Sequence, residues 1–367
     1  MKIAFITDVI SENMTGVGVY SRALIQSIMD SFPDFEYFFI DHKPHKKELF
    51  KYKKKPQIIL IKKNNSFFSK KSFWLNYIAL KLRNYDFDFI FNLDGAPHYL
   101  PFKQKEIFVL HDLSYLENFD YSPVLRQVNN QMFLYRSLTQ SYKVITNSNK
   151  TKKEAMIAFR IKDNKIIAIN DLPFLSVIKT KKYSTIKKPF FLCIGNLEKR
   201  KNILNLLDAF AILKEEYKIK QKLIIVGKSA FGGKEILKSY INNKYKKDIQ
   251  ITNYVNEQKK VFLFKNADLF IYPSFYEGLG IPLLEAANLK CPIVASNVPA
   301  GVEILKKNYF MMKYNDKNTV VATILKALRN TRIKQDLVNK SYQKAINYFN
   351  DQKYHQEMKR LFNFLIK

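Results

Sequence analysis

Short apolar runs alternate with longer amphipathic segments along the whole chain. Runs typical of buried strands cover residues 2–7, 36–42, 57–62, 87–92, 106–112, 143–148, 190–195, 222–227, 248–253, 268–273 and 292–297. Segments with helical periodicity lie between them, for example at residues 19–30, 203–217 and 258–265. Continuous apolar strands that alternate with helices indicate parallel sheets covered by helices on both faces. The pattern therefore predicts an α/β protein.

The alternation of strands and helices starts afresh near residue 188, which predicts two doubly wound, Rossmann-like domains. The length of 367 residues also suits two domains, each with its own core. Residues 333–367 are helical by pattern. The predicted limits are residues 1–175 for an N-terminal domain, 176–187 for a basic polar linker, 188–345 for a C-terminal domain, and 346–367 for a C-terminal helix that can cross back to the first domain.

The charge of the chain changes the picture of its partners. Lys and Arg number 62 against 32 Asp and Glu, so the formal net charge is +30. Such a charge favours phosphates, nucleic acid or an anionic membrane surface. Lys, Asn and Ile are all abundant, so a compositional bias without functional meaning is the competing explanation.

Neither cysteine usage nor the N-terminus indicates export. Cys193 and Cys291 lie in apolar runs and are expected to be buried thiols rather than partners in a disulfide. The first apolar run is broken by Thr7 and Asp8, so it predicts a strand rather than a signal peptide. We expect a cytoplasmic protein, with peripheral attachment to the inner face of the cytoplasmic membrane as an open alternative.

Residues that follow two predicted strands of the second half carry candidate chemistry. Arg200 and Lys201 fall in the loop between a strand and a helix. A diphosphate there would meet backbone N–H groups, the positive end of the helix dipole and two cationic side chains. Considered alone, the two residues are better explained as surface cations.

The stretch "SFYEGLGIPLLEA" places two acids, two glycines and a proline around the start of another helix. Pro282 suits the first position of that helix, and Gly278 and Gly280 lie in the loop before it. Glu285 would lie about one turn into the helix, where it suits ribose hydroxyls, while Glu277 would stay in the loop beside a sugar. Either acid alone is better explained as a complement to the helix dipole. Together, and in this order, the five residues favour a ligand site.

These segments resemble retaining glycosyltransferases of family 4, which have the GT-B fold. "YEGLGIPLLEA" is similar to the Glu-x7-Glu signature of that family, and "GNLEKRKNILNLLDAF" to its phosphate-binding segment. "NYVNEQKKVFLFKNADLFIYPS" and "PIVASNVPAGVEIL" resemble neighbouring elements. In the first half, "TGVGVYSRALIQSI", "FVLHDLSYL" and "VITNSNKTKKE" show a weaker likeness. The resemblance implies two Rossmann-like domains that face each other across a cleft.

The resemblance also implies roles for individual residues. It implies a catalytic set of His111, Arg200, Lys201 and Glu277. It implies a donor-binding set of Gly195, Asn196, Tyr254, Val255, Gly278, Leu279, Gly280 and Glu285, and an acceptor side of Gly16, Val17 and Gly18. In this scheme Arg200 and Lys201 hold the diphosphate, Glu285 the ribose, and Glu277 the transferred sugar. Asn196 departs from the family, because many relatives carry Arg there.

The resemblance implies retention through attack from the leaving-group side, with the departing phosphate as the base. Glu277 is then a sugar anchor rather than a general base, and no protein nucleophile is needed. Asp86 and Asp88 have the form of a metal-binding pair, but they lie at the front of a first-domain strand. We therefore expect no metal and no other cofactor, with the nucleotide sugar as co-substrate.

The basic first half leaves two interpretations open. Residues 43–71 contain eleven lysines and one acid, Glu48. The following segment places Phe73, Trp74, Tyr77 and other apolar residues on one helical face. That face would either lie on an anionic membrane or pack on the sheet of its own domain. The absence of an RNA-binding signature disfavours nucleic acid as a partner.

The sequence as a whole predicts a glycosyltransferase that uses a nucleotide-diphosphate sugar. The acceptor would be a glycan or a lipid-linked glycan in the synthesis of a cell-surface polysaccharide. The competing hypothesis is a non-catalytic or nucleic-acid-binding basic α/β protein.

Overall fold

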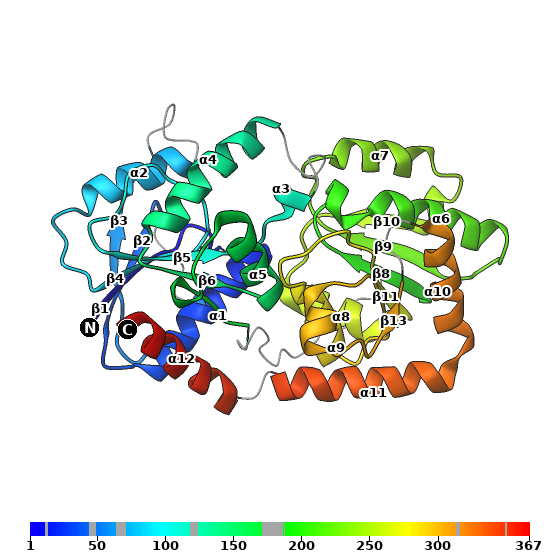
Figure 1. Ribbon diagram of the computed structural model, residues 1–367. Helices are drawn as coiled ribbons and strands as arrows, with labels where there is room; N and C mark the ends of the chain where they lie inside the picture. The colour runs from blue at the N-terminus through cyan, green and yellow to red at the C-terminus, as the bar shows by residue number, and fades with distance from the viewer. Residues whose placement is uncertain are drawn as a thin grey trace. The chain divides into compact units, whose positions relative to one another are not determined.

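The computed structural model describes residues 1–11, 14–43, 49–63, 71–117, 124–170, 186, 188–312, 316–348 and 351–367. The chain divides into two compact units (Figure 1). Unit 1 comprises Met1–Leu113, Val124–Phe174 and Phe349–Lys367, and unit 2 comprises Ser114–Pro123 and Leu175–Tyr348. The predicted linker, residues 176–187, lies outside the described residues except for Ile186.

Unit 1 is built on a seven-stranded sheet with the strand order β3-β2-β1-β4-β5-β6-β7. All neighbouring strands are parallel. The strands are β1 (Lys2–Ile6), β2 (Glu36–Asp41), β3 (Gln57–Leu60), β4 (Phe89–Asn92), β5 (Lys105–Leu110), β6 (Lys143–Thr146) and β7 (Ile166–Ala168). The order reverses between β1 and β4, as it does in doubly wound folds.

The helices of unit 1 are α1 (Gly16–Ser31), α2 (Lys71–Lys81), α4 (Val124–Gln140), α5 (Asn149–Phe159) and α12 (Asp351–Ile366). Helix α12 comes from the end of the chain and packs on the C-terminal end of α1. Phe362 contacts Phe32 and Phe35 at ring-centroid distances of 4.2 and 5.6 Å. Arg360 donates a hydrogen bond to the carbonyl oxygen of Ala168, the last residue of the edge strand β7. Phe362 is buried, and its contacts with the two partly exposed rings hold the last helix on the first unit.

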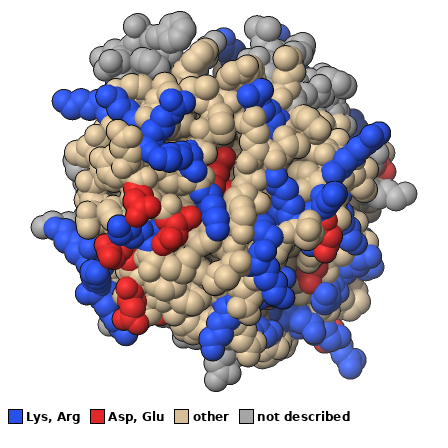
Figure 2. All heavy atoms as spheres, turned by 60° about the vertical axis from the view of Figure 1, so that its left-hand side comes forward, with Lys and Arg blue, Asp and Glu red and all other residues tan. Residues whose placement is uncertain are grey.

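The aromatic face of α2 packs against the unit's own sheet. Trp74, Ile78 and Leu82 are fully buried, in one cluster with Ile6 and Ile40 of the sheet. Of the two open interpretations, the structure supports packing on the sheet for Trp74, whereas Phe73 of the same predicted face is 40% exposed. Many Lys and Arg side chains are exposed, and Figure 2 shows them spread over one face of the molecule.

Unit 2 contains a six-stranded parallel sheet with the strand order β10-β9-β8-β11-β12-β13. Its strands are β8 (Phe190–Ile194), β9 (Lys222–Val226), β10 (Ile249–Thr252), β11 (Leu269–Tyr272), β12 (Ile293–Ala295) and β13 (Phe310–Met311). The order reverses between β8 and β11. The central strands are buried on both faces, which explains why their sequences are continuously apolar.

Helices cover both faces of the second sheet. They are α6 (Ile203–Glu215), α7 (Gly233–Asn242), α8 (Glu257–Asn266), α9 (Ile281–Asn288), α10 (Lys317–Arg329) and α11 (Thr331–Tyr348), with the short helix α3 (Ser114–Glu117) also assigned to this unit. Residues of α6, α7 and α10 share one apolar cluster with Phe191, Ile225 and Ile271 of the sheet. On the opposite face, Phe264 of α8 packs edge-on against Phe270, with the ring centroids 5.1 Å apart.

The predicted fold of two doubly wound α/β domains is confirmed, with three differences in detail. Strands β7 and β13, which have three and two residues, were not predicted. The helical segment predicted over residues 333–367 is two helices, since α11 ends at Tyr348 and α12 begins at Asp351. Pro282 is the second residue of α9 rather than the first, and its missing N–H is equally harmless there.

Candidate active site

The loops that carry Arg200, Lys201 and Glu277 meet where the strand order of unit 2 reverses. Arg200 and Lys201 follow β8, and Glu277 follows β11, its neighbour in the sheet. The backbone N–H of Phe275 donates to the carbonyl oxygen of Arg200 at 2.8 Å, which fastens the two loops together. In doubly wound sheets, ligands bind at this place, outside the carboxyl ends of the strands.

Both carboxylate oxygens of Glu277 are held by cations. Lys201 Nζ lies 2.5 Å from Oε1, and Arg200 Nη1 lies 3.0 Å from Oε2. All three side chains are at least four-fifths buried. Arg200 and Lys201 therefore both contact Glu277, although Lys201 and Glu277 are 76 positions apart in sequence.

Further contacts hold the two cations in place. Glu198 Oε2 accepts a hydrogen bond from Arg200 Nε at 2.8 Å, and Glu198 Oε1 accepts one from Asn196 Nδ2 at 3.0 Å. Lys201 Nζ also donates to the hydroxyl of Tyr272 at 3.2 Å. Sequence reasoning missed Glu198 and Tyr272. Glu198 carried a weak signal, because it stands in the same loop as the cations that it contacts.

The close packing around Lys201 depends on Gly195. A Cβ atom at Gly195 would lie 3.2 Å from Cε of Lys201, which is tighter than an ordinary contact. Glycine at this strand end therefore lets the lysine side chain lie against the backbone. Of the predicted donor-side residues, Gly195 thus leaves room for the side chain of Lys201. Asn196 donates a hydrogen bond to Glu198, which in turn holds Arg200.

The electrostatic environment of this cluster keeps Glu277 ionised. Burial opposes ionisation of the carboxyl, but Lys201 and Arg200 outweigh burial and lower the pKa of Glu277 to about 2. For Lys201 the balance differs: burial lowers the pKa of the ammonium group, against the opposing effect of Glu277. The arrangement is a pair of cations at a strand end whose charge is balanced by buried carboxylates.

Glu285 lies in α9 and has a different partner. Lys260 of α8 places Nζ 2.7 Å from Glu285 Oε1 and 2.8 Å from Oε1 of Glu257. Burial raises the pKa of the Glu285 carboxyl, while Lys260 acts in the opposite direction. The pKa of Lys260 is raised, because the two carboxylates beside it outweigh its own burial. Sequence reasoning missed Lys260, which is one of many lysines in amphipathic helices.

The loop before α9 takes the conformation that its glycines allow. Gly280 caps the helix with a φ of 98°, a left-handed backbone conformation that glycine adopts without strain. The carbonyl oxygen of Leu279 accepts a hydrogen bond from Ala300 N at 2.8 Å, which fixes the loop with Gly278 at its start. Tyr254 and Val255, predicted to border the base, lie in the loop between β10 and α8; Val255 is buried and Tyr254 is partly exposed.

The remaining predicted residues belong to unit 1. His111 follows β5, is buried, and its Nε2 lies 2.6 Å from the carbonyl oxygen of Leu93. Because a carbonyl can only accept, Nε2 carries the proton. Gly16, Val17 and Gly18 open α1, after the carboxyl end of β1. A side chain at Gly18 would place Cβ 2.5 Å from the carbonyl oxygen of Val9, whereas Gly16 has open space around it.

Asp86 and Asp88 lie at the amino ends of the strands of the first sheet, whereas His111 lies at the carboxyl ends. Both precede β4, and Asp88 Oδ2 accepts a hydrogen bond from the backbone N–H of Lys2 at 2.8 Å. Asp88 therefore joins the starts of two strands. In the part of the chain that the structure describes, no three His, Cys, Asp or Glu residues gather as metal ligands would.

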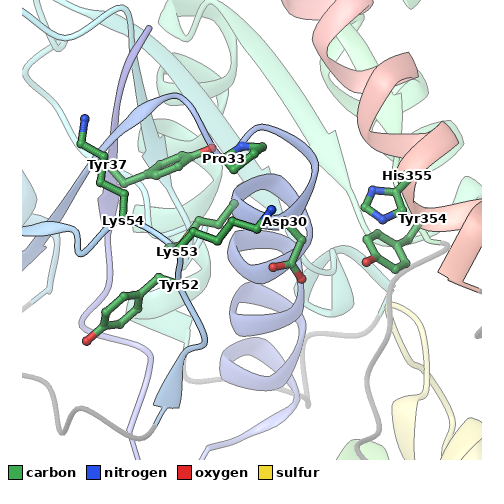
Figure 3. A pocket seen from close by; sticks show the side chains of 9 residues that line it. Asp30, Pro33, Tyr37, Tyr52, Lys53, Lys54, Tyr354 and His355 are labelled. Carbon is green, nitrogen blue, oxygen red and sulfur yellow. The ribbon is translucent and has the colours of Figure 1, made fainter.

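Unit 1 also contains a small cavity of about 200 Å³. Figure 3 shows it between the end of α1, the segment before β3 and the start of α12, with Asp30, Lys53 and His355 around it. Tyr37, near the amino end of β2, also lines the cavity. The cavity therefore lies at the amino ends of the strands, whereas His111 lies at the carboxyl ends. None of the predicted site residues lines it.

The sequence and the fold of this chain are similar to those of known proteins. Residues 177–344 match the family model described as Glycosyl transferases group 1. This segment carries every donor-side residue that the sequence predicted. The protein is a glycosyltransferase.

Individual relatives and solved structures also resemble this chain along nearly its whole length. The enzyme is 28% identical over 357 residues to the O-antigen chain mannosyltransferase B of Escherichia coli, covering 90% of this chain and 91% of the relative. Its fold resembles sucrose-phosphate synthase from Thermosynechococcus elongatus, with a TM-score of 0.75 and 16% identity over 100% of this chain and 99% of the other. Anabaena Alr3699/HepE, solved in complex with UDP and glucose, gives a TM-score of 0.71 and 15% identity over 99% of each chain. The enzyme has the GT-B fold.

Proposed function

We propose that the enzyme is a retaining mannosyltransferase of surface-polysaccharide synthesis, which moves mannose from a nucleoside diphosphate to a glycan or lipid-linked glycan. Its likeness to the O-antigen mannosyltransferase along nearly the whole chain supports the sugar and the pathway class. Assignment to family 4 and retention rest on the Glu-x7-Glu motif, whose two acids frame the start of α9.

The observation that carries the proposal is the convergence of Arg200 and Lys201 on Glu277 at the strand-order reversal. Without a donor, Glu277 contacts both cations, and Glu198 supplies the second negative charge through Arg200. A diphosphate offers them more charged oxygens than one carboxylate, so we expect it to take over these contacts when it binds. The same cations then face the charge that builds on the departing β-phosphate.

The low pKa of Glu277 bears on the mechanism. A carboxylate with a pKa of about 2 is a weak base near neutral pH, and oxygens paired with cations are poor nucleophiles. As long as both cations contact it, Glu277 therefore suits neither general-base catalysis nor a covalent intermediate. In the proposed mechanism, the acceptor hydroxyl attacks from the leaving-group side and gives its proton to the departing phosphate.

The other assignments remain proposals on the same basis. Glu285 would bind the ribose, and Tyr254 and Val255 would border the base. The backbone of Gly278, Leu279 and Gly280 would meet the β-phosphate and the sugar. His111 would contact the sugar from unit 1, and Gly16, Val17 and Gly18 would line the acceptor side. No metal is required in this scheme, because Arg200 and Lys201 supply the positive charge.

A donor screen tests the proposal. UDP, GDP and ADP are first compared for thermal stabilisation of the protein, since a ligand that binds only the folded state raises its stability. The α-linked mannose derivative of the stabilising nucleotide is then supplied with an acceptor glycan in EDTA. We expect an α-linked product, identified by nuclear magnetic resonance. A β-linked product would exclude retention, and full loss of activity in EDTA with recovery in manganese would exclude the metal-free scheme.

We also propose that unit 1 attaches peripherally to anionic membranes through exposed lysines. Lys53, Lys54 and Lys55 are exposed beside the edge strand β3. Because Trp74 is buried, attraction would be electrostatic, worth about 1 kcal/mol per lysine and screened by salt. No described helix is long and apolar enough to cross a membrane.

Binding to vesicles tests the attachment. Changing the three lysines to Gln should weaken co-sedimentation with anionic vesicles at low salt. The matched control changes three exposed lysines of unit 2, Lys238, Lys246 and Lys247, in the same way. Equal binding by the two variants would contradict the assignment to this surface.

A further inference from the structure

Lys260 is a buried lysine that joins two acids beside the proposed ribose site. Its side chain is only 13% exposed, and Nζ lies 2.7 Å from Glu285 Oε1 and 2.8 Å from Glu257 Oε1. The lysine stands in the first turn of α8, directly after the loop of Tyr254 and Val255. It thus connects the segment proposed to border the base with the acid proposed to bind the ribose.

The contact engages one oxygen of Glu285 and leaves the other available. Oε1 accepts from Lys260, while among the described residues Oε2 accepts no hydrogen bond. A ribose hydroxyl needs such an acceptor oxygen, held in a fixed direction. Lys260 fixes the carboxylate from one side without occupying both oxygens.

The charge of Lys260 also opposes the effects that favour protonation of Glu285. Burial raises the pKa of the Glu285 carboxyl, and the nearby charge of Glu257 raises it further. Lys260 is the group that lowers it, and both charged groups acting on Glu285 come from α8. Without the ammonium group, the buried acid would hold its proton to higher pH.

We propose that Lys260 is a positioning residue of the donor site, which holds Glu285 ionised and oriented so that Oε2 accepts a hydrogen bond from the ribose. This inference rests on the proposed function, since it takes Glu285 as the ribose ligand. Lys260 acts through Glu285 and does not itself touch the reacting atoms.

The experiment measures nucleotide affinity against pH. Lys260→Met, Lys260→Arg and wild type are titrated by calorimetry between pH 5.5 and 8 with UDP, GDP and ADP. We expect Lys260→Met to bind about tenfold more weakly than wild type at pH 5.5, because a neutral acid accepts a weaker hydrogen bond than a carboxylate. The difference should shrink as pH rises and Glu285 ionises. Lys260→Arg should remain close to wild type.

Two further variants separate positioning from a general structural effect. Lys259→Met changes the neighbouring lysine of the same helix, and its affinity should match wild type at every pH. In a Glu285→Gln background, Lys260→Met should have little additional effect, since the group through which it acts no longer titrates.

The possible failures are distinguishable. If none of the three nucleotides binds wild type, the proposed function itself fails. If wild type binds and Lys260→Met binds equally well at every pH, the inference about Lys260 is overturned. A loss of affinity that is the same at all pH values, or that persists unchanged in Glu285→Gln, overturns it as well, because it would show a merely structural role.

Discussion

Glu277 and Glu285 are separated by seven residues, yet their surroundings differ in kind. Both oxygens of Glu277 are held by cations, and its pKa is lowered to about 2. Glu285 has one oxygen held by Lys260, and burial raises its pKa. The first acid thus belongs to a charge-balanced cluster, whereas the second keeps an oxygen for another partner. A shared motif does not make the two acids equivalent.

The difference suggests how the two acids respond to a donor. Glu277 must give up contacts with Arg200 and Lys201 before a diphosphate can use them, so its cluster is the part that rearranges. Glu285 can accept a hydroxyl without losing Lys260. We therefore expect substitutions around Glu277 to affect catalysis most, and substitutions around Glu285 to affect binding most.

The largest expected effect comes from the cations of the Glu277 cluster. Arg200→Ala and Lys201→Ala should each lower turnover about 10²–10³-fold, as the loss of charge-stabilising donors typically does. Lys199→Ala is the matched control, because Lys199 stands in the same turn but contacts Glu235 on the surface. Steady-state kinetics on variants shown to be folded by circular dichroism measure the effect. Near-normal turnover in the double variant would place the diphosphate elsewhere.

A smaller effect concerns thermal stability. The contributions of Glu277 and Glu285 to stability should change in opposite directions as pH rises. The folded-state pKa of Glu277 is lowered from 4.5, so its ionised form stabilises the protein above pH 4.5 and this contribution is lost as pH falls toward 2. The folded-state pKa of Glu285 is raised from 4.5, so its contribution diminishes as pH rises above that value.

Melting temperatures of Glu277→Gln and Glu285→Gln, measured against wild type from pH 3.5 to 7, test this contrast. The advantage of wild type over Glu277→Gln should grow with rising pH, while its advantage over Glu285→Gln should decline. A change of 1 kcal/mol corresponds to about 2–4 °C for domains of this size. Parallel pH profiles for the two variants would mean that the acids share one environment after all.

The sequence could reveal the two sheets, because their buried strands are continuously apolar, and it could place Arg200, Lys201 and Glu277 at strand ends. It could not show that these three side chains touch. That contact depends on β8 and β11 being neighbours, which is a property of the strand order. Strand order follows from how the crossover helices pack, and no local pattern records it.

Trp74 and Lys260 show a second kind of limit. An aromatic helical face flanked by lysines has the same pattern whether it packs on a sheet or lies on a membrane, and the burial of Trp74 decided between them. Lys260 had no distinguishing signal, because the chain has 62 Lys and Arg residues and most helices present several. In both cases the deciding information is the neighbouring element in space.

The docking of α12 on unit 1 has a consequence for how the chain is made. Phe32 and Phe35 cannot pack against Phe362 until the end of the chain has been made. Residues 175–348 must be synthesised after the main part of unit 1 and before α12. At 5–20 residues per second, that interval lasts roughly 9–35 s. The domain that leaves the ribosome first therefore completes its packing last, and it exposes an apolar surface to the cell until the final helix arrives.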